Sequence, residues 1–156
     1  MSINNGTHHV VRFSSGEVWY FSFSHDRGIL FQQLGKNGLW KRPYELIPNG
    51  QEDFSVSIDN QDHLHLICRS NQGELLYLLY NGINWSRQVL SQYEPARYTI
   101  RYPIVIPIDN RIHIFFAIGK AFNTGFWSLQ HYFWDETSWH SSEITKVTAG
   151  YKLSPF

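Results

Sequence analysis

Three tryptophans that are each followed two residues later by a polar side chain are the part of this sequence best suited to bind a ligand. Side chains at positions i and i+2 of a β-strand lie on the same face. An indole can stack on the apolar face of a sugar ring while a neighbouring guanidinium donates hydrogen bonds to its hydroxyls. The alternative role for each tryptophan is packing between sheets, with the arginine stem lying across an edge strand. The predicted ligand-binding residues are Trp40 with Arg42, Trp85 with Arg87, and Trp139, which precedes Ser141.

Histidine side chains are the next candidates, because eight of them occur and imidazole is a common metal ligand. His63 and His65 share a strand face, but a metal ion needs three or four ligands that converge. Only His65 and His113 hold equivalent positions in the repeats described below. We therefore expect a structural role for these two, as hydrogen-bond partners of the preceding turns at Asp59 and Asp109. No metal site and no cofactor are predicted.

Short catalytic motifs are absent from the sequence. It contains no Gly-x-Ser-x-Gly, no phosphate-binding loop and no metalloprotease helix. A glycosidase needs two facing carboxylates, and the spacing of the arginines at 69, 97, 101 and 111 singles out no cluster for a carboxylate ligand. We predict no catalytic residues, although an active site assembled from distant loops stays open.

Composition limits the possible partners. The 156 residues form one domain of ordinary length, and Lys plus Arg balance Asp plus Glu at 13 each. No long-range field therefore attracts nucleic acid or an anionic membrane, and neither is a predicted partner. Cys68 is the only cysteine, which excludes an intramolecular disulfide. The first residues have neither a basic region nor an apolar core, so we expect a soluble chain without an export signal, cytoplasmic by default.

The elements that must position these residues are short strands. Residues 54–90 contain turn-forming clusters at 59–62, 70–73 and 81–82, rich in Asp, Asn and Gly, which separate runs of apolar, β-favouring side chains. Four strands joined by three tight turns are predicted, and they form an antiparallel sheet.

This unit occurs three times, with Trp40, Trp85 and Trp139 as markers 45 and 54 residues apart. Periods in this range are typical of propellers and other repeat arrays. The copies span about 8–47, 53–91 and 102–145, and 150–156 is the start of a fourth repeat or a C-terminal strand. The first copy has strands at 9–13, 18–23 and 29–34 and a fourth that opens at Trp40. The third has strands at 104–108, 112–117, 128–134 and 139–144, with its extra length inserted in a turn at 121–125.

The second and third strands of the unit are apolar on both faces. Leu64 and Leu66 point one way and Ile67 the other, and the third copy repeats the pattern with Ile114 against Phe115. An antiparallel sheet with one solvated face alternates apolar and polar residues, so these sheets must lie between other sheets. The predicted fold is an all-β propeller of three four-stranded antiparallel blades. A β-sandwich ranks second, because it gives no reason for the repeat.

The spacing resembles the blade repeat of bacterial β-propellers, including propeller lectins and relatives of the sialidase superfamily. The resemblance is carried by Asp59-Asn60, Leu64-His65, Gly73-Glu74-Leu75-Leu76-Tyr77 and Gly82-Ile83-Asn84-Trp85. Residues 24–31 are also similar to the sialidase Asp-box, Ser-x-Asp-x-Gly-x-Thr-Trp, with Leu30 in place of Thr and Phe31 in place of Trp. The resemblance implies a propeller fold, with sugars bound near or between blades in its lectin members.

Three such sheets leave two apolar faces without a neighbour. Either the chain is a fragment of a longer propeller, or two chains form a homodimer with a six-bladed ring. The predicted function is a non-enzymatic, lectin-like module that binds a glycan. A protein-interaction scaffold is the first alternative, and a fragment of a glycoside hydrolase or sialidase is the second.

Overall fold

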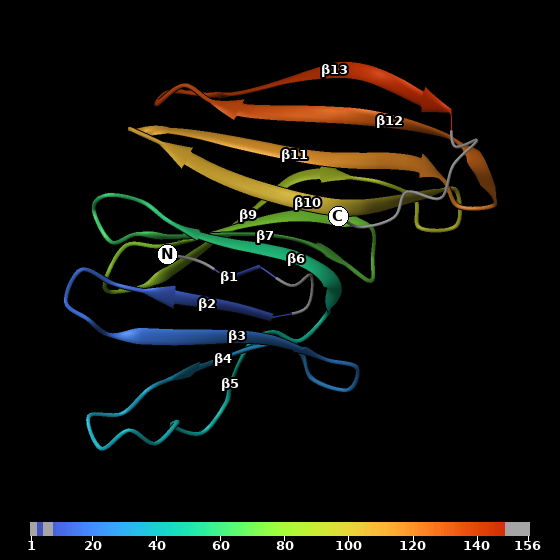
Figure 1. The fold of residues 1–156 in the computed structure, drawn as a ribbon. Helices are drawn as coiled ribbons and strands as arrows, with labels where there is room; N and C mark the ends of the chain where they lie inside the picture. Colours follow the sequence, from blue (N-terminus) through green and yellow to red (C-terminus); the bar gives the residue numbers. More distant parts are fainter. Residues whose placement is uncertain (1–2, 5–7, 149–156) are drawn as a thin grey trace.

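The computed structural model describes residues 3–4 and 8–148, which form three antiparallel β-sheets (Figure 1). Sheet 1 contains β1 (Ile3–Asn4), β2 (His8–Arg12), β3 (Val18–Ser24), β4 (Gly28–Gln33) and β5 (Tyr44–Ile47). Sheet 2 contains β6 (Gly50–Ile58), β7 (Leu64–Ser70), β8 (Glu74–Tyr80) and β9 (Trp85–Gln92). Sheet 3 contains β10 (Tyr98–Ile108), β11 (Arg111–Lys120), β12 (Asn123–Trp134) and β13 (Trp139–Thr148). The predicted all-β class with three antiparallel sheets is confirmed.

Strands that follow one another in the sequence are neighbours in each sheet. The short turns predicted between them explain this order, because a hairpin connection places consecutive strands side by side. Residues 3–4 and 8–148 include no helix with the length and apolar character that a membrane span requires.

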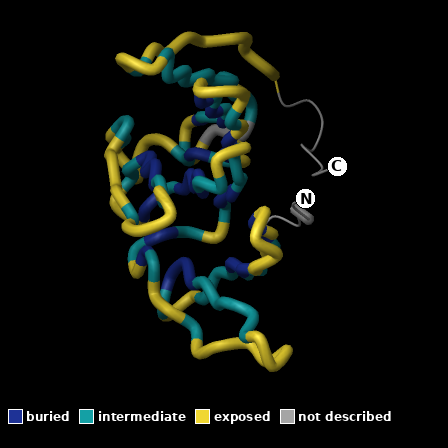
Figure 2. The backbone as a smooth tube through the Cα atoms, turned by 90° about the vertical axis from the view of Figure 1, so that its left-hand side faces the viewer, coloured by how far each residue is buried: buried dark blue, intermediate teal, exposed yellow. Residues whose placement is uncertain are grey.

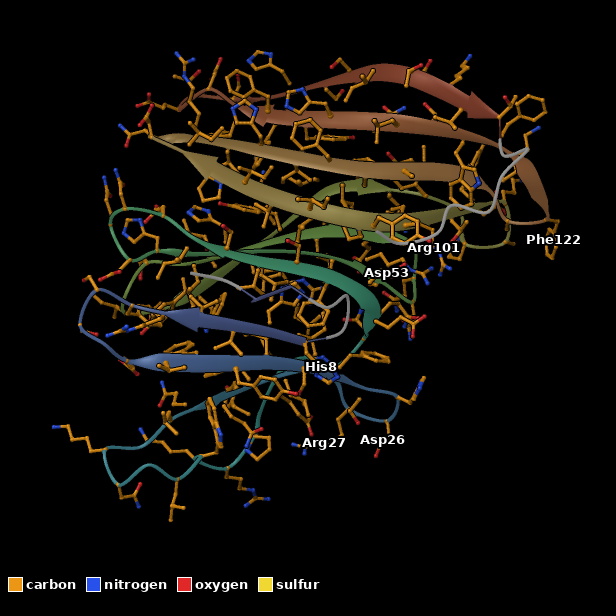
Figure 3. All side chains as sticks on the ribbon, viewed as in Figure 1. His8, Asp26, Arg27, Asp53, Arg101 and Phe122 are labelled. Carbon is orange, nitrogen blue, oxygen red and sulfur yellow. The ribbon has the colours of Figure 1, made fainter. Side chains whose placement is uncertain are left out.

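The three sheets spread out from β2, β6 and β10. β6 of sheet 2 packs against β10 of sheet 3 and against β2 of sheet 1, whereas the last strands of the outer two sheets, β5 and β13, lie at opposite ends of the molecule (Figure 1). Asp53 of β6 and Arg101 of β10 form an ion pair across this junction, with 3.5 Å between Oδ2 and Nη1 (Figure 3). Burial raises the pKa of Asp53 despite the two nearby guanidinium groups of Arg101 and Arg69.

The two central strands of sheet 2, β7 and β8, are buried on both faces, as the sequence predicts for the second and third strands of the unit. Every residue of β7 from Leu64 to Cys68 is buried. Leu64 and Leu66 belong to the core shared with sheet 1, while Ile67 and Leu75 belong to the core shared with sheet 3. Figure 2 shows the buried segments between the sheets and the exposed β13 at one end. Removal of this apolar surface from water on both sides is the main stabilising contribution to the fold.

The first and third copies differ in detail from the prediction. Trp40 forms only an isolated bridge with Leu34, and the last strand of sheet 1 begins at Tyr44, because Pro43 before it has no N–H to donate to a ladder. β1 is an additional, unpredicted strand. In the third copy, β11 ends at Lys120 and β12 begins at Asn123, so the extra residues lengthen strands and do not form the predicted insertion. The predicted start of a fourth repeat at 150–156 lies outside the described residues.

Two glycines occupy equivalent turns between the second and third strands of the repeat unit. Gly28 and Gly73 have φ angles of 72° and 83°. A β-carbon at either position would overlap a backbone carbonyl oxygen of the chain that follows, that of Ile47 or that of Tyr93. Only glycine adopts this conformation at such close approach without strain, so the first two copies share a turn that the sequence specifies.

Candidate ligand-binding site

A cavity of about 550 Å³ lies between sheets 2 and 3. Residues of the turns from β6 to β7 and from β10 to β11 line it, as does the first residue of β13. Its walls include His65, Tyr77 and Gln88 from sheet 2 and Asp109, Trp134 and Trp139 from sheet 3. The region between these two sheets is called the cavity seam below. A concave site with an aromatic wall and a few convergent polar groups is the usual form of a small-molecule site.

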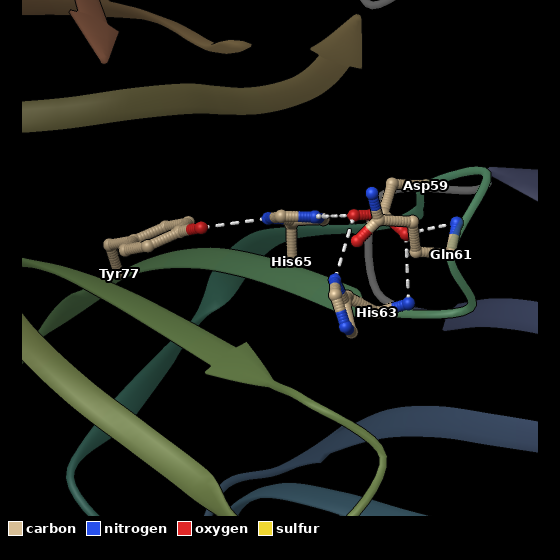
Figure 4. A network of polar contacts seen from close by, with 5 residues as sticks. All are labelled: Asp59, Gln61, His63, His65 and Tyr77. Carbon is tan, nitrogen blue, oxygen red and sulfur yellow. Dashed lines mark hydrogen bonds and ion pairs between the residues drawn. The ribbon is translucent and has the colours of Figure 1, made fainter. Parts of the chain in front are cut away.

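A chain of polar contacts forms the sheet 2 wall (Figure 4). Asp59 follows directly after β6. Its Oδ2 lies 3.1 Å from Nε2 of His65 and 3.1 Å from Nδ1 of His63. Its Oδ1 accepts the backbone N–H groups of Gln61 at 2.8 Å and His63 at 2.9 Å. On the other side of the His65 ring, Nδ1 lies 2.7 Å from the hydroxyl of Tyr77. The sequence predicted the bond between His65 and Asp59, and it is present.

The protonation states in this chain follow from burial. Burial lowers the pKa of His65, although the hydrogen bond and charge of Asp59 oppose the shift. Burial alone would raise the pKa of Asp59, but hydrogen bonds from His63, His65 and Gln61 outweigh it, and the pKa is lowered. Burial raises the pKa of the Tyr77 hydroxyl. Near neutral pH, Asp59 is therefore a carboxylate, His65 is neutral and Tyr77 is protonated.

One tautomer satisfies every group in the chain. Nε2 of His65 donates to the Asp59 carboxylate, which leaves Nδ1 to accept the proton of the Tyr77 hydroxyl. The Tyr77 oxygen then keeps its lone pairs for a further partner. The Tyr77 oxygen is therefore an acceptor in a fixed position, because its own O–H already donates to His65.

Trp139 forms the facing aromatic wall. Its ring makes an edge contact with Tyr77, with 5.3 Å between centroids, and lies 5.5 Å from the ring of Trp134. The indole Nε1 donates to Oε1 of Gln88 across the seam at 3.1 Å. Contacts from two sheets therefore fix the orientation of this side chain, as a preorganised stacking surface requires.

The predicted binding residues are dispersed. Trp139 and Arg87 both line the cavity. The guanidinium of Arg87, however, lies 3.4 Å from the Glu74 carboxylate. Arg87 pairs with Leu78, so its side chain is on the face of β9 that turns toward sheet 1. Trp85 packs against the core between sheets 1 and 2. Trp40 is 45% exposed and, like the exposed Arg42, lies on sheet 1, away from the cavity.

The sequence alone indicates a structural role for His65 and points to neither Tyr77 nor Gln88. The strand pairing could have indicated Tyr77. His65 pairs with Leu79, and a tyrosine two residues from that partner is close enough to reach the histidine ring. The expected bond between His113 and Asp109 does not form. His113 Nδ1 instead lies 3.1 Å from Nε2 of His131, in a stacked pair on the uncovered face of sheet 3. Among the described residues, no three His, Cys, Asp or Glu side chains are placed to hold a metal ion.

Comparison with known proteins gives matches of structure only. No family model matches the chain, and no curated protein matches its sequence. A fucose lectin from Kordia zhangzhouensis, solved in complex with methyl-fucoside, has a similar structure, with a TM-score of 0.54 and 16% identity over 85% of this chain and 95% of that chain. A triple arginine-to-alanine mutant of AofleA from Arthrobotrys oligospora gives a TM-score of 0.48 and 10% identity over 94% of this chain and 57% of that chain. The chain therefore has an all-β fold like that of the Kordia lectin.

Proposed function

We propose that this protein is a non-enzymatic, lectin-like module that binds a glycan in the cavity seam. One observation carries the proposal: an oriented indole faces fixed polar groups across a cavity of about 550 Å³. A pyranose has an apolar face that stacks on an aromatic ring and equatorial hydroxyls that need both donors and acceptors. Trp139 supplies the first, and Tyr77 and Gln88 supply the second. The Kordia lectin of similar fold, which was solved with methyl-fucoside, suggests the first sugar to try.

The acceptor on Tyr77 gives this site its selectivity. A site built to hydrogen-bond a hydroxyl rejects an analogue that lacks it, because the buried polar group is then left unpaired. The proposed site therefore prefers a sugar that places one hydroxyl against Tyr77 while its apolar face lies on Trp139. Deoxygenation of that hydroxyl is expected to weaken binding more than removal of a hydroxyl that points to solvent.

Titration of methyl-fucoside and of a panel of free monosaccharides, followed by calorimetry or by the tryptophan fluorescence of the protein, tests the proposal. We expect saturable binding of at least one sugar, and Trp139→Ala is expected to raise the dissociation constant at least about tenfold because the stacking surface is lost. Trp85→Ala is the matched control, since the same indole is removed from the neighbouring seam. Absence of binding to any sugar, or equal weakening by both substitutions, contradicts the proposed site.

The three sheets are, in this proposal, blades of a β-propeller spanning about 8–47, 53–91 and 102–145. Burial of sheet 2 on both faces supports this reading, because a two-layer sandwich leaves one face of every sheet solvated. Three blades do not close a ring. A homodimer with six blades would close it, and small-angle scattering from the dimer should then show a flat ring of twice the mass of one chain.

A further inference from the structure

Among residues 3–4 and 8–148, no segment covers the outer face of sheet 3, and this face is apolar. Ile104, Ile106 and Ile108 project from β10 on this face and are 43%, 40% and 52% exposed. Their strand partners on β11 include Phe115 and His113. Both of these rings stack with His131 of β12, and Phe133 of β12 lies tilted against His113. Branched aliphatic chains beside a row of stacked rings form a contiguous apolar surface of the kind that marks an interaction site.

The face of sheet 2 that sheet 3 covers is equivalent to this outer face of sheet 3 and serves as a comparison for it. Strand register gives the equivalences, because His65 pairs with Leu79 as His113 pairs with Phe133, and Ile67 pairs with Tyr77 as Phe115 pairs with His131. The strand partners of Ile67 and His65 on β6 are Ser55 and Ser57, where sheet 3 has Ile104 and Ile106. The uncovered face is thus more apolar than the covered one. Its composition is that of a surface made for burial.

The free face of sheet 1 carries the complementary element. Trp139 is the residue of sheet 3 that covers Tyr77 and bonds Gln88 of sheet 2. Trp40 holds the equivalent position in sheet 1, since its bridge with Leu34 matches the pairing of Trp134 with Trp139. It lies on the side of sheet 1 away from sheet 2, against Tyr20 at 5.8 Å between centroids, and is 45% exposed.

We propose that a second copy of this chain docks head to tail, so that the free face of sheet 1 in one copy covers the free face of sheet 3 in the other. Trp40 of the partner subunit then lies over His131 and Ser142, as Trp139 lies over Tyr77 and Gln88. Each copy contributes both faces, so two equal contacts form when the two chains close a ring of six sheets. The inference rests on the proposed arrangement of blades and not on glycan binding, because the cavity seam lies within one copy.

The test is the mass of the protein in solution, measured by light scattering after size exclusion over a range of concentrations. The wild type is expected to have twice the 18.4 kDa mass of one chain. Ile106→Glu on sheet 3 and Trp40→Glu on sheet 1 each place a charge in both contacts, and each is expected to raise the dissociation constant of the dimer at least about tenfold. Ile83→Glu is the matched control, because Ile83 is 80% exposed in the turn before β9. Ile108→Glu replaces Ile106→Glu if the latter does not fold.

Mixing the two variants separates head-to-tail docking from any symmetric pairing of one face with itself. In a mixed dimer, one contact combines both altered faces and the other combines two native faces. Dimers should therefore reappear in the mixture at concentrations where neither variant dimerises alone. A monomeric wild type, a Trp40→Glu variant that dimerises normally, or a mixture no better than its components would each overturn the proposal. Loss of sugar binding in a normal dimer would count against the proposed function alone.

Discussion

The two seams of the molecule are built on the same strand register but filled differently. The aromatic seam between sheets 1 and 2 is packed with rings, and those of Trp19 and Phe31 stack at 4.9 Å between centroids with 13° between their planes. In the cavity seam, the equivalent positions hold His65 and Tyr77. The tryptophan from the next sheet meets an aromatic surface in the first case and a polar chain beside a cavity in the second.

If the proposed function is correct, this difference explains how one scaffold gives both a packing interface and a binding site. An indole and a phenyl ring fill the space between two sheets and need few polar partners. An imidazole and a phenol leave part of the space open, and each polar atom buried there must find a hydrogen bond. The chain from Asp59 through His65 to Tyr77 satisfies this requirement. The aromatic seam contributes stability through packing, whereas the cavity seam leaves an open space lined by satisfied polar groups.

The largest effect is expected from emptying the aromatic seam. Phe21 is fully buried there, and Phe21→Ala should reduce the free energy of unfolding by about 3–5 kcal/mol, measured by urea denaturation, because a large cavity replaces the ring. Phe122→Ala removes the same ring from a turn where it is 93% exposed, and this control should change stability by less than about 0.5 kcal/mol. Similar losses in both variants would show that the aromatic seam is not the stabilising interface.

The sequence could predict the sheets but not the contrast between their seams. Burial on both faces of a strand can be predicted from a short apolar run, such as that from Leu64 to Cys68, and turn residues predict the strand order. Trp85 and Trp139 are equivalent in the repeat, yet one packs in a core and the other lines a cavity. What decides between them is the residue on the facing sheet, Phe31 or Tyr77, which lies far away in the sequence. Such contacts between residues of different sheets can be identified only once the fold is known.

A smaller effect is expected from breaking the polar chain in the cavity seam. Tyr77→Phe leaves Nδ1 of His65 buried without its donor, which should cost about 1–3 kcal/mol in urea denaturation. Tyr44→Phe removes the same hydroxyl from a side chain that is 62% exposed and is the matched control. If the two substitutions cost the same, the Tyr77 hydroxyl has no role in satisfying His65.

Replacing both members of that pair sharpens the comparison. The double variant His65→Phe with Tyr77→Phe makes this part of the cavity seam resemble the aromatic seam, and it removes both buried polar partners together. We expect it to be less destabilised than the sum of the single variants, because neither group is then left unpaired. A double-mutant cycle in urea measures this coupling, and strict additivity would contradict a direct interaction. Sugar binding in the double variant should be lost, since the acceptor is absent.

The smallest expected effect is a fall in stability as the pH decreases from about 7.5 to 5. His65 and His9 are buried, and burial lowers the pKa of each below the value it has in the unfolded chain, although hydrogen bonds to Asp59 and to the Phe54 carbonyl oppose the shift. Below the ordinary histidine pKa, the unfolded chain therefore binds protons that the folded chain does not, so the free energy of unfolding decreases with falling pH until the folded pKa values are reached.

Denaturation midpoints in urea across this range measure the slope of stability against pH. The double variant lacking His65 should show a shallower slope, because only His9 of this pair then contributes. A slope of opposite sign would mean that these histidines are charged in the folded protein, and the tautomer assigned to His65 would then be wrong.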